Sequence, residues 1–146
     1  IFFLFFLGCK PIEPVNFVEI QNVKINSSTG NKLNISAEIV LDNPNKVKII
    51  IENIDVDIYA ENIILVNINE EESRELIESS ETTIQITGDV NLKNLEEFLN
   101  KKGLAIILGG DDVSLKFVGS IKAKAHGIKD QIDINYTINS VKGLIN

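Results

Sequence analysis

The chain has 146 residues, a net charge of −7, one cysteine and one histidine. That length suits one domain with a sizeable core, and a single cysteine excludes an internal disulfide. The lysines are scattered rather than clustered, which argues against a nucleic-acid partner and against electrostatic docking on anionic lipid.

The first eight residues, Ile1 to Gly8, form an almost unbroken apolar run that ends at Cys9. The run is shorter than the roughly 20 residues of a membrane-spanning helix, but it has the length of a signal-peptide core. Leu7-Gly8-Cys9 is similar to the end of a bacterial lipobox, in which the cysteine is acylated and becomes the mature N-terminus. We therefore expect residues 1–8 to be a truncated lipoprotein signal peptide and Cys9 to be the lipidation site.

Two features depart from a complete lipoprotein signal. Phe6 occupies a position where leucine is more usual, and neither a methionine nor a basic segment precedes the apolar run. The alternative is a buried first strand with Cys9 in the core, because cysteine is among the most buried residue types. Six consecutive Phe and Leu residues ahead of a proline-containing segment fit that alternative poorly. Residues 9–14 are then the lipidated N-terminus and an extended tether, and residues 15–146 are one domain.

From residue 15 onward, apolar and polar residues alternate in the pattern of half-buried strands. Within residues 48–59 the apolar positions change phase at Glu52-Asn53, which predicts a β-bulge because one extra residue exchanges the buried face. The last two strands are joined by a short connection, residues 126–131, and are expected to form a hairpin. The expected strands are residues 15–25, 33–41, 48–59, 63–68, 82–90, 113–125 and 132–138.

One helix is expected before the last two strands. Asn94 and Glu97 have the spacing of a capping box, and a shared apolar face consists of Leu95, Phe98 and Leu99. The helix ends at Gly103 or continues to Gly109-Gly110.

The segment Glu70–Glu81 contains six glutamates, so it is expected to be a solvated acidic loop. About seven strands with turns at regular spacing, together with one helix, predict an all-β fold. The expected architecture is an antiparallel immunoglobulin- or fibronectin-III-like β-sandwich.

The order of these elements between Val15 and Ile138 resembles the late embryogenesis abundant type-2 family, also called the water-stress and hypersensitive-response domain. The resemblance implies a non-enzymatic role in desiccation or envelope stress, through weak binding or protection of other molecules. Bacterial members often carry a lipoprotein signal directly before the domain. The residues that carry the resemblance are Asn43-Pro44-Asn45 after an alternating strand, Ile54–Tyr59, the Thr82–Val90 strand, the single helix and Leu115–Gly119.

Asn43-Pro44-Asn45 is expected to be a structural motif. Proline cannot donate to a β-ladder and favours an extended Asn43, while the flanking asparagines bond backbone groups and tolerate turn conformations. The alternative is that Asn43 and Asn45 present their amides to a ligand.

No group of residues indicates catalysis, a cofactor or a metal. His126 adjoins Gly127 at a hairpin end and has no nucleophile motif near it, so a hydrolase is the least favoured function. One histidine, with Cys9 assigned to the N-terminus, makes a poor zinc site. The glutamates of residues 70–81 and the pair Asp111-Asp112 lack the spacing of a calcium loop.

The sequence thus predicts a non-enzymatic lipoprotein, attached through acylated Cys9 to the cell membrane or outer membrane and facing the periplasm or exterior. The residue after Cys9 is Lys10 rather than aspartate, which favours sorting to the outer membrane in a host with two membranes.

Two alternative functions stay open. One is an interaction or assembly module of an envelope complex, which accepts a partner strand at a sheet edge. The other is a carrier of a small apolar ligand, held between the sheets and the helix.

Overall fold

The computed structural model describes residues 13–28, 30, 32–71, 73–76, 78–107, 113–125 and 127–139. Cys9, His126 and Asp111-Asp112 lie outside the described residues, so what the sequence predicts for them stays a prediction.

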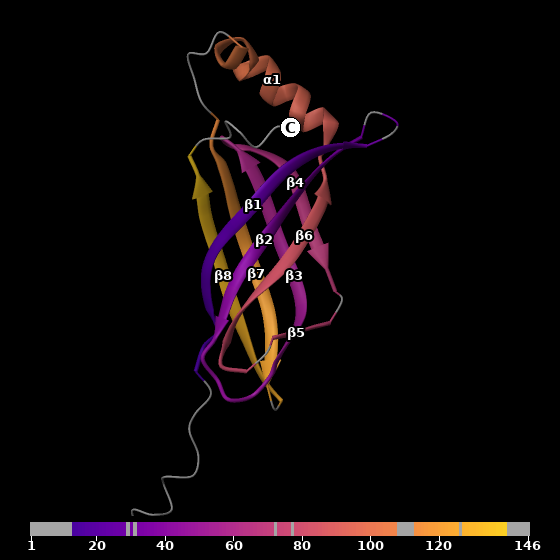
Figure 1. The fold of residues 1–146 in the computed structure, drawn as a ribbon. Helices are drawn as coiled ribbons and strands as arrows, with labels where there is room; N and C mark the ends of the chain where they lie inside the picture. The colour runs from indigo at the N-terminus through magenta and orange to yellow at the C-terminus, as the bar shows by residue number, and fades with distance from the viewer. Residues whose placement is uncertain are drawn as a thin grey trace, which may run out of the picture.

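Eight strands and one helix form within the described residues, and they pack as a sandwich of two antiparallel sheets (Figure 1). One sheet has the strand order β1-β2-β6, and the other has the order β4-β3-β7-β8, with β5 also paired to β3. The predicted antiparallel sandwich, with a helix before its last two strands, is therefore confirmed. The elements are β1 (Asn16–Ser28), β2 (Lys32–Asn43), β3 (Ile49–Ala60), β4 (Ile63–Glu70), β5 (Arg74–Leu76), β6 (Ser80–Asp89), α1 (Leu92–Ile107), β7 (Leu115–Ala125) and β8 (Ile128–Ile138).

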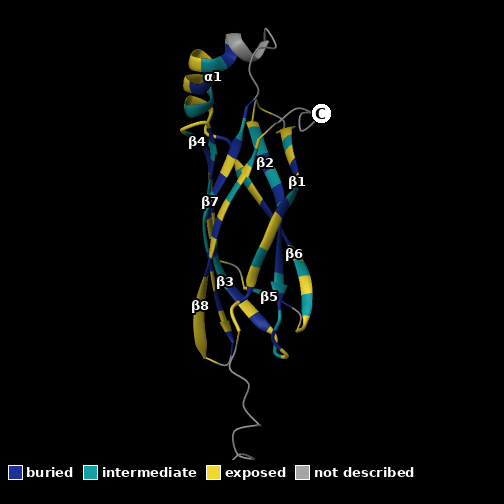
Figure 2. Cartoon of the chain, turned by 90° about the vertical axis from the view of Figure 1, so that its left-hand side faces the viewer, coloured by how far each residue is buried: buried dark blue, intermediate teal, exposed yellow. Residues whose placement is uncertain are grey.

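The core lies between the sheets because each strand turns alternate apolar side chains inward (Figure 2). The edge strands of the two sheets also meet. β1 lies over β8, where the rings of Phe17 and Tyr136 make an edge-to-face contact with centroids 5.9 Å apart. The largest fully buried side chains come from both sheets and include Ile35, Ile39, Leu41, Ile54, Ile58, Phe117 and Ile121.

The predicted bulge in the third strand is confirmed. The register between β3 and β7 shifts between Ile51 and Asn53, and Ile51 and Ile54 are both fully buried although they are three residues apart. One extra residue therefore resets the alternation, as the change of phase in the sequence indicates.

The acidic segment is not the continuous loop that the sequence predicts. β5 forms inside it and pairs antiparallel with the start of β3, with Leu76 opposite Ile49. Leu76 is fully buried, so one apolar side chain among the glutamates is enough to bring this stretch onto the sheet. Arg74 forms an ion pair with Glu70, which further joins β5 to the end of β4.

The helix begins three residues earlier than predicted. The side chain of Asn91 accepts a hydrogen bond from the Asn94 N–H at 3.0 Å, so Asn91 is the N-cap and the capping box at Asn94 and Glu97 was wrong. Phe98 is buried and Leu95 packs against the core, but Leu99 is 49% exposed. The apolar face is therefore narrower than predicted, and the helix continues past Gly103 to Ile107.

The closing hairpin is tighter than the sequence suggests. β7 and β8 pair without a register shift from Leu115 opposite Ile138 to Ala125 opposite Ile128. Two residues connect them, and Gly127 has a φ of 77° that suits glycine. This hairpin lies at the opposite end of the sandwich from α1 (Figure 1).

Candidate functional site at the N-terminal end of the sandwich

Asn45 fastens the incoming chain to the end of the sandwich opposite α1. Its Oδ1 accepts a hydrogen bond from the Glu13 N–H at 2.7 Å, and its Nδ2 donates to the Glu13 carbonyl at 2.8 Å. The side chain thus pairs with both backbone groups of one residue, as a neighbouring strand would. Asn45 is 7% exposed, so these bonds lie largely out of water.

Asn43 holds Asn45 in place. The Oδ1 of Asn43 accepts hydrogen bonds from the Asn45 backbone N–H and from Asn45 Nδ2, each at 3.0 Å. Its own Nδ2 donates to the Val47 carbonyl at 2.9 Å, which closes the loop around Pro44. Asn43 is 1% exposed, and burial of such a polar group costs free energy unless it is hydrogen-bonded. Both amides are therefore used within the protein.

A third segment joins this loop. The Ser79 N–H donates to the Asn45 carbonyl at 2.8 Å, so the turn before β6 is attached to the same residue. Nearby, Lys48 Nζ lies 3.0 Å from Glu75 Oε1, and this hydrogen bond raises the pKa of Lys48 above its usual value. Both side chains are exposed, so the ion pair adds little to stability.

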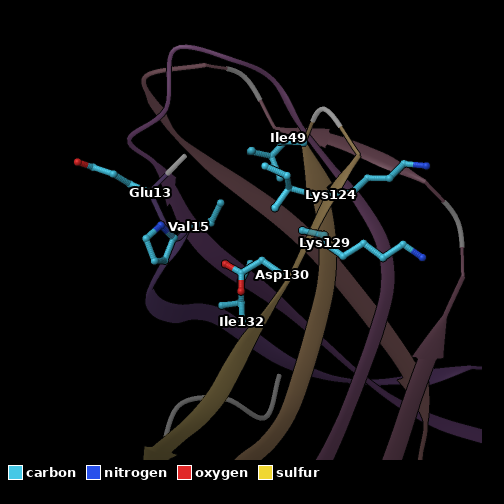
Figure 3. A pocket seen from close by; sticks show the side chains of 11 residues that line it. Glu13, Val15, Ile49, Lys124, Lys129, Asp130 and Ile132 are labelled. Carbon is cyan, nitrogen blue, oxygen red and sulfur yellow. The ribbon is translucent and has the colours of Figure 1, made fainter. Parts of the chain in front are cut away.

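A cavity of about 260 Å³ opens beside this loop, between the start of β1 and the β7–β8 hairpin (Figure 3). Small residues of β7, Ala123 and Ala125, leave space on the inner face, and Val15, Ile49 and Ile132 supply apolar walls. In Figure 3 the Asp130 side chain lies at the mouth, whereas the Lys124 and Lys129 side chains extend away from it. No residue of α1 whose side chain the structure describes lines this cavity, so it is not the ligand space that the sequence predicts beneath the helix.

Sequence reasoning identifies Asn43, Pro44 and Asn45 but misses Glu13 and Ser79. Asn45 bonds to Glu13 across 32 positions and to Ser79 across 34, and no local pattern signals such distant partners.

Two other kinds of feature are absent from the described residues. No helix within the described part of the chain is long and apolar enough to cross a membrane. Within the same residues, no cluster of three or more His, Cys, Asp or Glu side chains has the arrangement of a metal site.

Comparisons with known proteins agree with this architecture. The family model for late embryogenesis abundant protein, LEA_2, matches residues 38–139. A protein from Archaeoglobus fulgidus, known from a crystal structure, superposes with a TM-score of 0.61 and 12% identity, over 86% of this chain and 98% of that one. A protein from Arabidopsis thaliana, known from a solution structure, gives 0.67 and 12%, over 90% and 84%. No curated protein sequence matches.

The β-sandwich with one helix before its last hairpin thus defines the class of protein. The chain belongs to the late embryogenesis abundant type-2 family. Membership supports a stress-related or binding role, and the family is generally non-enzymatic.

Proposed function

We propose that this protein is a non-enzymatic lipoprotein whose domain acts at the cell envelope, in protection against desiccation or related stress. The observation that carries the proposal is the apolar run Ile1–Gly8, which ends at the only cysteine, directly ahead of a domain of this family. Acylated Cys9 would attach the chain to the cell membrane or outer membrane. Stable attachment needs at least two acyl chains, since a single chain binds only marginally.

The contacts of Asn45 support this arrangement physically. Glu13 is fixed to the folded domain by two hydrogen bonds, and it follows Cys9 by four residues. Four residues span at most about 14 Å. An anchored domain would therefore remain close to the membrane surface instead of ranging over a long linker.

Cell fractionation combined with a drying assay tests the proposal. Cells expressing equal amounts of wild type or of Cys9→Ser are separated into membrane and soluble fractions, dried and rehydrated. We expect wild type in the membrane fraction with higher survival, and Cys9→Ser in the soluble fraction with lower survival. Equal membrane association of the two proteins would contradict attachment through Cys9. Equal survival of the two strains would contradict a protective role at the membrane.

A further inference from the structure

The two sheets have four edges, formed by β1, by β6, by β4 together with the short β5, and by β8. An edge strand presents unpaired backbone groups that pair with another chain unless the edge is interrupted or covered. Among the described residues, β1 is interrupted, β4 and β6 accept backbone hydrogen bonds from other segments of the chain, and the backbone of β8 bonds to no segment other than β7.

β1 is interrupted twice. Its register with β2 shifts between Phe17 and Glu19 and again between Gln21 and Lys24, and Asn22 between the latter two has a φ of 51°. These bulges twist the strand and break the regular spacing that a partner strand needs.

β4 and β6 are occupied by other parts of the chain. In β4 the Leu65 carbonyl accepts a hydrogen bond from the Asn91 N–H, and the Ile64 carbonyl accepts one from Asn94 Nδ2, each at 2.8 Å. In β6 the Gln85 carbonyl accepts a hydrogen bond from Arg74 Nη1 at 2.5 Å. The start of α1 therefore occupies two carbonyls of β4, and the Arg74 side chain occupies one carbonyl of β6.

β8 is a regular strand of 11 residues, and its pairing with β7 has no register shift. Among the described residues, the backbone of β8 makes one hydrogen bond besides those to β7. In that bond the Gln131 N–H donates to Oδ1 of the neighbouring Asp130 at 2.8 Å. That contact is exposed, so a partner strand can replace it. The hairpin half of β8, residues 128–131, is exposed throughout (Figure 2).

The charges on the outer face of β8 are self-complementary. Lys129, Gln131 and Asp133 occupy every second position of the strand, so their side chains lie on the same face. Lys129 stands opposite Lys124, whose own ion pair is with Glu52 at 3.2 Å, and no described carboxylate pairs with Lys129. A cation and an anion thus lie at equal distances on either side of Gln131.

We propose that β8 pairs antiparallel with β8 of a second copy, centred on Gln131. In this register Lys129 of each copy stands opposite Asp133 of the second copy, which places two identical ion pairs around a two-fold axis. The pairing does not depend on lipidation of Cys9.

Disulfide trapping tests the pairing. The full chain carrying Cys9→Ser is purified in detergent with either Gln131→Cys or Asn135→Cys, two exposed positions on one face of β8. Directly paired residues lie within the Cα separation of 4.4–6.8 Å that disulfides need, whereas two copies of residue 135 would be about 27 Å apart at about 3.4 Å per residue. We expect rapid cross-linking of Gln131→Cys and little of Asn135→Cys. No cross-linking of Gln131→Cys, or equal cross-linking of both variants, would overturn the proposal.

Charge reversal tests the register in the full chain carrying Cys9→Ser alone, which has no thiol and whose dimer can therefore dissociate. Lys129→Asp alone and Asp133→Lys alone replace both attractive pairs with repulsive ones, so each should weaken dimerisation about tenfold by sedimentation equilibrium. The double variant Lys129→Asp/Asp133→Lys rebuilds the pairs and should restore dimerisation. If the single variants dimerise like the parent, or the double variant stays as weak as they are, the register is wrong.

Discussion

At the scale of single residues, Asn45 connects three parts of the chain that lie far apart in sequence. It binds Glu13 through its side chain, Ser79 through its carbonyl and Asn43 through its backbone N–H. Few side chains can replace it, because only a carboxamide both donates and accepts in this planar arrangement.

Asn45→Ala should therefore lower the free energy of unfolding by about 1–3 kcal/mol, because it leaves Glu13 and the Asn43 oxygen short of partners in a largely buried site. Urea denaturation measures the change. The matched control is Asn135→Ala, which removes an exposed asparagine and should change stability by less than about 0.5 kcal/mol. Equal losses for the two variants would show that the buried hydrogen bonds of Asn45 contribute nothing particular.

The loop at Asn43-Pro44-Asn45 can be predicted from the sequence only in part. Proline between two asparagines after an alternating strand is sufficient to predict a structural loop. The partners of that loop depend on the packing of the whole domain, which brings Glu13 and Ser79 to the same end. The cavity beside it arises because small residues, Ala123 and Ala125, face inward where larger ones occur elsewhere on the strand.

At the scale of elements, alternation predicts the long strands well because each buries one face. Even the bulge at Glu52-Asn53 can be read from the change of phase. β5 escapes prediction because three residues are too few to show a period. The N-cap is misplaced because Asn91 and Asn94 lie one turn apart and have the same side chain. Asn94 instead donates to the Ile64 carbonyl of β4, a tertiary contact with no local signal.

The helix offers a direct test of its narrow apolar face. Phe98 is 5% exposed and Leu99 is 49% exposed. Phe98→Ala should cost about 3–4 kcal/mol of folding free energy by loss of buried area and creation of a cavity, while Leu99→Ala should cost less than about 1 kcal/mol. Thermal unfolding of both variants measures the difference. A similar loss for the two would indicate that α1 docks through a wider face, as the sequence alone suggests.

At the scale of the whole molecule, the net charge of −7 and the scattered lysines offer anionic lipid no basic surface. The membrane attachment that we propose is therefore covalent, through acyl chains. Cys9 is the only thiol available, and the fixed segment at Glu13 makes the N-terminus the natural point of attachment. Attachment would also concentrate the protein in two dimensions, which favours the pairing of β8 proposed above.

Mass spectrometry of the N-terminal peptide from the membrane fraction tests whether Cys9 is the residue of attachment. We predict a mature chain that begins at Cys9 and carries the added mass of at least two acyl chains. A membrane-fraction peptide in which Gly8 still precedes an unmodified Cys9 would contradict the claim.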